Sequence, residues 1–248
     1  MSLLEVKDLC RTFRQGDTDI HAVGHVSFSM EAGEMLAIVG QSGSGKTTLL
    51  NLLGGIDKPS AGQVLLDGRD IHTLSDAEAA KLRRQKIGYI YQDFKLLPIL
   101  TAKENIMLPA ILDGKKAPAR VVSALADRLG IGNRLNHLPS QMSGGQRQRL
   151  TIARALVRRP ELLILDDSAS ALDFATDAAL RKALSKLPWK PTVVLISQRV
   201  SSIRHADKIV VLDDGHMAGL GTHTQLQQTC PVYQEICRSQ EKGEASAS

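Results

Sequence analysis

Long apolar runs, cysteines and aromatic side chains are all scarce in this sequence of 248 residues. The apolar runs stay well below the roughly 20 residues that a membrane-spanning helix needs, and the first residues lack the pattern of a secretory signal. We therefore expect a soluble chain whose membrane role, if it has one, depends on a separate partner or a further segment. The three cysteines, Cys10, Cys230 and Cys237, are scattered, which excludes a disulfide framework and favours reduced thiols in the cytosol.

Aromatic residues make up 3% of the chain, and this scarcity argues against base stacking on a single-stranded nucleic acid. The net charge of +5 suits polyphosphate ligands or anionic surfaces and selects neither of them. The chain is 43% hydrophobic and 23% charged, which is an ordinary balance for a globular protein with a sizeable core. Composition therefore indicates a globular protein and leaves its ligand open.

Short apolar segments rich in β-branched residues recur along the chain and are expected to be strands. They lie at residues 3–6, 23–28, 35–39, 64–66, 87–91, 162–165, 193–196 and 209–212. Helical patterns alternate with the later segments, at residues 47–53, 118–129, 145–157 and 175–187. This alternation predicts an α/β fold with a mostly parallel sheet that is covered on both faces.

Other stretches modify this plan. Asp67-Gly68 and Asp213-Asp214-Gly215 predict tight turns between neighbouring strands, so some antiparallel pairing is expected. Residues 93–156 carry much helical pattern and little strand signal, which predicts a helical lobe inserted into a core formed by residues 1–92 and 157–240. Residues 241–248 are small and polar, and we predict a disordered tail there.

A glycine-rich loop follows the strand predicted at residues 35–39. Residues 40–47 read Gly-Gln-Ser-Gly-Ser-Gly-Lys-Thr, which fits the G-x-x-x-x-G-K-[ST] pattern of a phosphate-binding loop. Glycines let backbone N–H groups approach phosphates closely, and the following helix offers its positive end to the same anion. Lys46 adds a charge for the β- and γ-phosphates, and the Thr47 hydroxyl is placed to bind Mg²⁺. The predicted phosphate-binding residues are Gly40, Ser42, Gly43, Ser44, Gly45, Lys46, Thr47 and Thr48.

Two acids end the apolar run at residues 162–165. A buried parallel strand delivers its last residues to the carboxyl edge of the sheet, where ligands bind in such folds. Asp166 is expected to hold Mg²⁺ through water, and Asp167 to stand near the γ-phosphate as a base for the attacking water. The alternative is a solvated pair of acids at a strand end.

The segment at residues 142–149 reads Met-Ser-Gly-Gly-Gln-Arg-Gln-Arg. Ser143 fits an N-cap, so the segment predicts a second anion-binding helix terminus. A chain with one phosphate loop needs a second such terminus only if two copies close on each other, each capping the γ-phosphate held by the other. The S-G-G-Q-x-Q-R run is similar to the signature of the ABC ATPase family, and the resemblance covers almost the whole chain.

The resemblance implies a P-loop (RecA-like) core, an antiparallel β-subdomain at the N-terminus, and an inserted helical subdomain. It also implies ATP and Mg²⁺ as ligands, a second ATP-binding cassette and a transmembrane transporter subunit as partners, and a place on the cytoplasmic face of a membrane. The residues that would cap the γ-phosphate are Ser143, Gly144, Gly145 and Gln146.

Other family positions match single residues. Phe13 lies where the family stacks an aromatic ring on adenine, although a core phenylalanine is the alternative. Gln92 matches the residue that senses the γ-phosphate and Mg²⁺, so the implied metal ligands are Thr47, Gln92 and Asp166. Residues 170–173, Ser-Ala-Leu-Asp, match the loop that contacts the opposite copy.

At two positions the sequence departs from the family pattern. Asp167 replaces the usual catalytic glutamate, and Gln198 replaces the usual histidine over the γ-phosphate. Aspartate is shorter by one methylene, and a misplacement near 1 Å can lower a rate by about 100-fold. A glutamine amide can donate a hydrogen bond but cannot carry a positive charge. We therefore predict tight ATP binding and slow hydrolysis, with Asp167, Gln198, Gln92 and Lys46 as the catalytic set.

The two parts of the chain resemble different subfamilies. Residues 1–155 resemble macrolide-export and lipoprotein-release ATPases, whereas residues 160–240 resemble the impaired-site subunit of heterodimeric exporters. The alternatives are an engineered or recombined chimera and a natural divergent subunit.

Three functions follow from these patterns. The first is an energy-coupling ATPase of a transporter, and the second is an ATP-gated dimerising clamp with negligible turnover. The third, a soluble non-transport ABC protein acting on ribosomes or DNA, is disfavoured because such proteins commonly carry paired cassettes or long insertions. The arginines at residues 147–159 are interpreted as a solvated helix face, so we expect no nucleic-acid partner.

Overall fold

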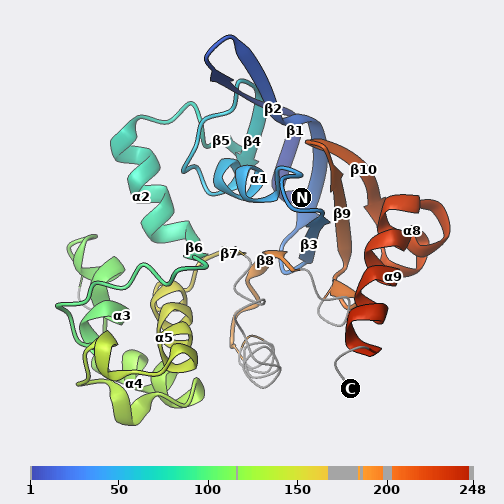
Figure 1. Cartoon of the computed structure of the whole chain (residues 1–248). Helices are drawn as coiled ribbons and strands as arrows, with labels where there is room; N and C mark the ends of the chain where they lie inside the picture. The colour runs from blue at the N-terminus through green and yellow to red at the C-terminus, as the bar shows by residue number, and fades with distance from the viewer. Residues whose placement is uncertain (1, 116, 167–183, 185–186, 198–202, 246–248) are drawn as a thin grey trace. The chain divides into compact units, whose positions relative to one another are not determined.

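The computed structural model describes residues 2–115, 117–166, 184, 187–197 and 203–245. It forms two compact units (Figure 1). Unit 1 comprises Met1–Ser75 and Thr192–Ser248, and unit 2 comprises Asp76–Pro191. Within the described ranges, every helix falls short of the length and apolar character needed to cross a membrane.

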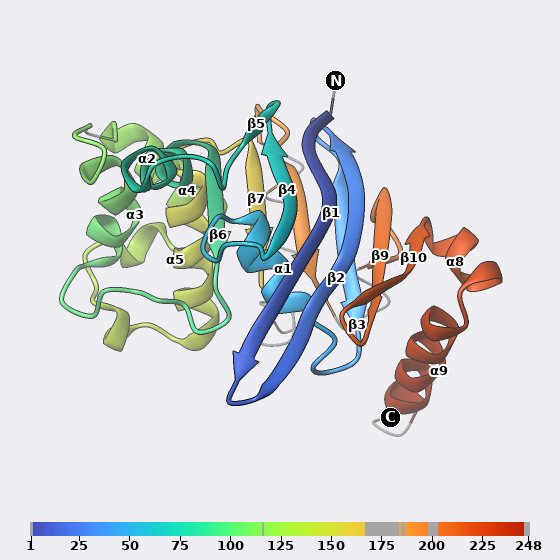
Figure 2. The ribbon, with the colours of Figure 1, turned by 90° about the horizontal axis from the view of Figure 1, so that it is seen from above.

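Unit 1 begins with a long antiparallel hairpin of β1 (Ser2–Gln15) and β2 (Thr18–Glu31), seen along its length in Figure 2. Burial in the second half of β2 alternates with a period of two, as expected for a strand with one face on the core. β4 (Ala61–Leu66) pairs antiparallel with β1, and β5 (Arg69–Asp70) pairs antiparallel with β4. The turn predicted at Asp67-Gly68 is confirmed, and both of its residues have positive φ, at 52° and 73°.

The central strand of unit 1 is β3 (Met35–Gly40), which pairs parallel with β8 (Thr192–Ile196) and with β9 (Lys208–Asp213). β10 (His216–Gly221) follows the predicted turn after Asp213 and pairs antiparallel with β9 and parallel with β2. The strand order in this unit is β5-β4-β1-β2-β10-β9-β3-β8. The mixed sheet with parallel strands at its centre confirms the predicted fold class.

Helices α8 (His223–Thr229) and α9 (Pro231–Ala245) lie beside β9 and β10 in Figures 1 and 2. Tyr233 and Cys237 pack into a buried cluster with strand residues such as Val211. The helix α9 continues into the segment 241–248, for which the sequence predicts disorder. Residues 246–248 lie outside the described chain.

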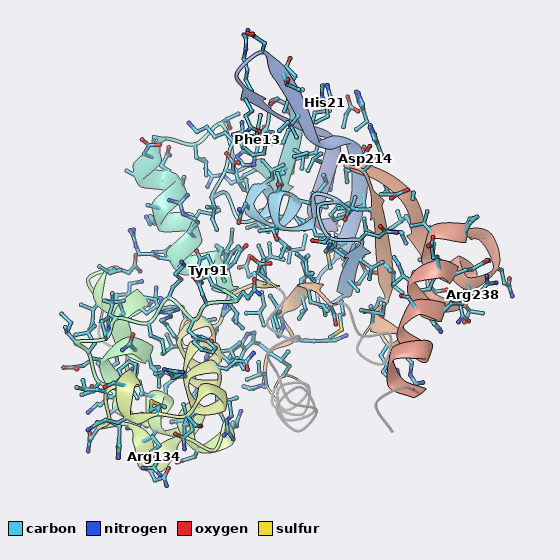
Figure 3. The ribbon with its side chains drawn as sticks, in the orientation of Figure 1. Phe13, His21, Tyr91, Arg134, Asp214 and Arg238 are labelled. Carbon is cyan, nitrogen blue, oxygen red and sulfur yellow. The ribbon has the colours of Figure 1, made fainter. Side chains whose placement is uncertain are left out.

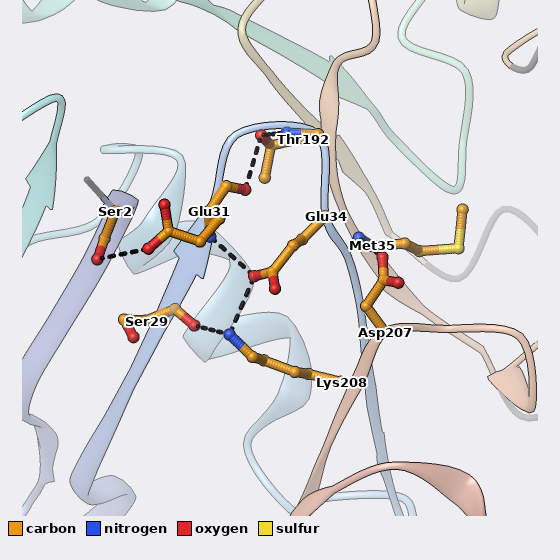
Figure 4. Close-up of polar contacts among 9 residues, drawn as sticks. Ser2, Ser29, Glu31, Glu34, Met35, Thr192, Asp207 and Lys208 are labelled. Atoms are coloured by element: carbon orange, nitrogen blue, oxygen red, sulfur yellow. Dashed lines mark hydrogen bonds and ion pairs between the residues drawn. The ribbon is translucent and has the colours of Figure 1, made fainter.

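A polar network holds the turn that leads into β3 (Figure 4). The Thr192 hydroxyl accepts a hydrogen bond from the Gly33 N–H at 2.8 Å and donates to the Glu31 carbonyl at 3.5 Å. The Glu34 carboxylate accepts from the Glu31 N–H at 2.7 Å and from the Lys208 ammonium at 3.0 Å. The ends of three strands, β2, β8 and β9, therefore fix the start of β3. The glycine-rich loop follows the other end of β3.

Unit 2 contains a parallel strand pair, β6 (Ile87–Ile90) and β7 (Leu162–Leu165), in which every residue of β7 is buried. Its helices are α2 (Asp76–Lys86), α3 (Ala102–Ile111), α4 (Ala119–Arg128) and α5 (Gly144–Leu156). Two 3-10 turns, Gly132–Arg134 and Pro139–Gln141, precede α5. The helical lobe at residues 93–156 and its boundaries stay a prediction, and most of the helix predicted at residues 175–187 lies outside the described residues.

Candidate nucleotide-binding site

In unit 1 the glycine-rich loop joins β3 to α1 (Lys46–Leu53). A Cβ added to Gly45, whose φ is 91°, would lie 2.0 Å from the Ala22 carbonyl oxygen. A Cβ added to Gly40 would lie 2.3 Å from the Leu212 carbonyl oxygen. Both positions accept only glycine, because neighbouring backbone occupies the space that any side chain would need.

Lys46 turns its ammonium back onto this loop. Its Nζ donates to the carbonyls of Gly40 at 3.0 Å and Gln41 at 2.7 Å, and its side chain is almost fully buried. The hydroxyl of Ser44 is buried and has no hydrogen-bond partner within the described part of the chain. The Lys46 ammonium and the Ser44 hydroxyl thus provide a cation and a hydrogen-bond donor at the same loop, which fits a polyphosphate ligand.

The start of α1 also suits an anion. Gly45 is the N-cap and offers no side-chain acceptor, and the first turn holds no acidic residue. The N-cap residue therefore supplies no side-chain acceptor to the leading N–H groups of α1, and the helix dipole adds positive potential there. Thr47 is exposed and Thr48 half-buried in this turn.

Phe13 lies on β1 of unit 1, near His21 of β2 (Figure 3). Its side chain is 37% exposed, and the Arg11 guanidinium lies 4.4 Å from the ring centre. Arg11 is itself held by Asp57 at 3.0 Å. The ring is therefore supported by a fixed cation and keeps exposed surface, which an adenine could cover.

In unit 2, Asp166 directly follows β7 and is 9% exposed. Its N–H donates to the Ile90 carbonyl at 3.0 Å, so the strand pairing extends to this residue. Burial, and secondarily the Asp166 carboxylate, raises the pKa of Tyr89 well above its ordinary value. Asp167, Gln198 and the loop at residues 170–173 lie outside the described residues.

Gln92 is exposed at the beginning of an irregular loop after β6. Tyr91, labelled in Figure 3, stacks on Tyr89 with ring centres 4.3 Å apart. Phe94 and Lys95 both have left-handed backbone, with φ of 62° and 45°. The polypeptide therefore turns sharply just after the residue that the family resemblance assigns to γ-phosphate sensing.

Ser143 caps α5, as predicted. Its hydroxyl accepts from the Gln146 N–H at 3.3 Å, and the Gln146 side-chain oxygen accepts from the Ser143 N–H at 3.0 Å. This reciprocal capping box fixes the helix start. Ser143 and Gly144 are exposed, so this terminus faces outward from unit 2.

A family model described as ABC transporter matches residues 23–170. The chain belongs to the ABC transporter family. A macrolide export ATP-binding/permease protein MacB of Brucella abortus (strain 2308) is 39% identical over 240 residues, which are 94% of this chain and 37% of that protein. The MacB of Pasteurella multocida (strain Pm70) is 43% identical over 218 residues, which are 87% of this chain and 34% of that protein. The chain thus spans little more than a third of the curated relatives that it matches.

Solved ABC structures are similar as well. A dimeric post-hydrolysis state of the ATP-binding cassette MJ0796, bound to ADP and Pi, has a TM-score of 0.82 and 35% identity over 88% of this chain and 98% of that one. A bacterial Atm1-family ABC exporter with ATP bound has a TM-score of 0.81 and 31% identity over 96% of this chain and 42% of that one. This cassette is an ATP-binding domain of a family that hydrolyses ATP. Its division into two subfamily parts stays a prediction.

Some polar residues that shape this cassette were not predicted from the sequence. Asn105 of α3 is fully buried and bonds the loop ahead of its helix: its Oδ1 accepts from the Leu97 N–H at 3.0 Å, and its Nδ2 donates to the Leu100 carbonyl at 2.9 Å. Thr101 and Glu104 form a capping box at the start of α3. The T-x-x-E spacing was a signal for that helix, whereas a single asparagine in an apolar helix carries no comparable signal.

Proposed function

We propose that this cassette binds Mg-ATP, closes head-to-tail on a second cassette, and powers a membrane transporter. The observation that carries the proposal is a pair of helix termini in one chain that both suit an anion. One follows the phosphate loop and has no side-chain cap, and the other begins at the exposed Ser143. A single triphosphate needs both only if the second comes from another copy.

Different residues contact different parts of the nucleotide. Gly40, Ser42, Gly43, Ser44 and Gly45 present backbone N–H groups to the phosphates. Lys46 neutralises the β- and γ-oxygens, and Thr48 lies in the same first helical turn. Ser143, Gly144, Gly145 and Gln146 would cap the γ-phosphate of the partner copy.

Thr47, Gln92 and Asp166 would hold Mg²⁺. They offer a hydroxyl, an amide oxygen and a carboxylate, which are the oxygen donors that Mg²⁺ prefers, with water completing the shell. Bound there, the ion would screen the negative charge on the β- and γ-phosphates. The donor chemistry of these three residues therefore suits the metal.

A membrane partner is proposed from the family and from unit 2. The curated relatives are named as ATP-binding/permease proteins. Unit 2 exposes large apolar side chains that are unusual on a free surface. These are Leu97 at 41%, Ile99 at 83%, Ile111 at 51% and Leu112 at 62% exposure. We infer that they contact a transmembrane subunit and place the cassette on the cytoplasmic face of the membrane.

Hydrolysis is proposed to be slow because Asp167 and Gln198 stand where the family has glutamate and histidine. Asp167→Glu combined with Gln198→His should raise kcat by about 10- to 100-fold, because the base regains its reach. Steady-state phosphate release under saturating Mg-ATP measures this. A native chain that already turns over several times per second and gains nothing from the double substitution would contradict slow hydrolysis.

The alternative is an ATP-gated clamp in which the closed dimer is itself the product, and the same two substitutions favour it. Size-exclusion chromatography with Mg-ATP should give a dimer for the native chain and a monomer for Lys46→Ala, which loses the phosphate charge. Dimerisation with no turnover in either the native or the restored chain would favour the clamp. A chain that stays monomeric under saturating ATP would argue against both functions.

A further inference from the structure

Side chains of α5, the helix capped by Ser143, bind the loop that follows Gln92. About three turns along α5, Arg154 donates from Nη1 to the Lys95 carbonyl at 2.6 Å and from Nη2 to the Phe94 carbonyl at 2.7 Å. Nearer the start of the helix, the Arg147 guanidinium lies 5.6 Å from the centre of the Phe94 ring. Two arginines of one helix therefore hold adjacent residues of one loop.

The two loop residues that Arg154 binds, Phe94 and Lys95, have a strained backbone conformation. Phe94 and Lys95 have φ of 62° and 45°, and consecutive non-glycine residues in the left-handed region are strained. Within the loop, the Phe94 N–H reaches the Tyr91 carbonyl at 3.4 Å, the Lys95 N–H donates to the Asp93 carbonyl at 2.7 Å, and an exposed Asp93–Lys95 ion pair spans 2.5 Å. The fork of Arg154 adds support from outside the loop, because it binds both carbonyls of the left-handed pair at once.

Arg154 is poorly explained as a stabilising residue alone. It is a partly buried cation that donates hydrogen bonds to two neutral carbonyl oxygens, and burial lowers the pKa of its guanidinium. Even partial burial of a charge is costly, so an apolar residue would fill the same space at a lower cost in solvation. Holding the geometry of the loop is the feature that an apolar residue cannot reproduce.

We infer that Arg154 is a positioning residue that ties the Gln92 loop to the helix carrying Ser143, so that the two move as one body. The inference rests on the proposed function, since it takes Gln92 as the γ-phosphate sensor and Ser143 as the cap for the other copy's nucleotide. A shift of Gln92 is then passed through Phe94 and Lys95 to Arg154, and along α5 to Ser143, all within unit 2. Nucleotide binding is thereby coupled to the position of Ser143, which contacts the other copy's nucleotide.

The test separates nucleotide affinity from dimerisation. Arg154→Met should leave the Kd of the monomer for an ATP analogue within about 2-fold, since the phosphate loop is built inside unit 1 without it. The dimerisation constant in Mg-ATP should weaken by about 10- to 100-fold, the scale of a misplacement near 1 Å. Titration calorimetry and analytical ultracentrifugation measure the two quantities.

Arg158→Met is the matched control. Arg158 is also a partly buried arginine, just beyond α5, but it donates to the Asp113 carboxylate at 2.7 Å rather than to the Gln92 loop. It should lower thermal stability without weakening the dimer of the folded protein. Equal losses of dimerisation in the two variants would show that Arg154 serves stability alone and would overturn the inference.

A rescue variant removes the remaining ambiguity. In the Arg154→Met background, Lys95→Gly lets the backbone adopt the left-handed conformation without strain, and dimerisation should recover by about 3-fold or more. Failure to recover, or an equal loss of monomer affinity for the analogue, would overturn the inference. A native chain that binds the analogue and never dimerises would instead overturn the proposed function.

Discussion

The two loops that we assign to the γ-phosphate are built in opposite ways. The loop of residues 40–46 in unit 1 is fixed by backbone: Gly45 fits under the Ala22 carbonyl, and Lys46 bonds carbonyls of its own loop. The loop after Gln92 in unit 2 is fixed by side chains of two helices, namely Asn105 of α3, which follows the loop directly, and Arg154 of α5, which is distant in sequence.

This difference predicts that the loop of residues 40–46, which we call the cradle, is rigid and that the loop after Gln92, which we call the adjustable loop, can move. A loop fixed by close backbone packing has one conformation, because any displacement meets carbonyl groups within van der Waals distance. A loop held by a few side-chain hydrogen bonds can move with the helices that hold it. We therefore expect substitutions in the first loop to abolish nucleotide binding, and substitutions around the second loop to alter coupling or stability while binding survives.

The largest expected effect is on the cradle. Gly45→Ala places a Cβ 2.0 Å from the Ala22 carbonyl oxygen at a φ of 91°, so we expect a loss of about 3 kcal/mol or more in unfolding free energy, since strain and clash add. ATP-analogue binding should fall by at least about 100-fold. Urea unfolding and titration calorimetry measure both changes.

Gly16→Ala is the control for that variant. Gly16 has a φ of 63° and no atom within 4 Å of the added Cβ, so it should cost only the strain of about 1 to 2 kcal/mol and leave nucleotide affinity intact. Similar losses of affinity in the two variants would argue that the close backbone contact is not what shapes the cradle.

An intermediate effect is expected at the adjustable loop. Asn105→Ala removes the partners of the Leu97 N–H and the Leu100 carbonyl, and we expect unfolding free energy to fall by about 2 to 3 kcal/mol. Analogue affinity should stay near that of the native chain. Asn133 of the same unit is exposed, and Asn133→Ala should change stability by no more than about 0.5 kcal/mol. A collapse of nucleotide binding in Asn105→Ala would break the distinction between the loops.

The smallest effect is a pH dependence that differs between the units. His72 in unit 1 bonds the Leu52 carbonyl at the end of α1 at 3.0 Å, and burial lowers its pKa below the ordinary 6.5. The unfolded chain therefore binds a proton more readily, so this contribution to stability is full above pH 6.5 and declines as the pH falls below it. Asp113 in unit 2 behaves differently: a hydrogen bond from Gln85, together with Arg158, lowers its pKa below 3.8, so its interactions persist to lower pH.

Urea unfolding between pH ~7.5 and ~5.5 measures this dependence. The native chain should lose stability more steeply than His72→Gln, while His205→Gln, at an exposed position of the same unit, should retain the native slope. Identical slopes in all three proteins would mean that His72 makes no contribution to acid sensitivity.

Elements whose burial is regular could be predicted from sequence. The run at residues 162–165 coincides with β7, and the strand at residues 35–39 differs from β3 by one residue. β10 escaped prediction because none of its residues is buried, and α2 because none of its side chains is buried either. A capping box at Thr222 was a usable signal for α8.

What the sequence alone determined is local chemistry: the glycines and lysine of residues 40–46, and the serine cap at Ser143, each depend on neighbours within a few positions. What only the tertiary structure decided is which distant side chain holds which loop. Phe94 and Arg154 are 60 residues apart, and no spacing rule connects them, because their contact depends on how α5 packs within unit 2. Short motifs determine local backbone geometry, whereas contacts between side chains and distant loops depend on the folded structure.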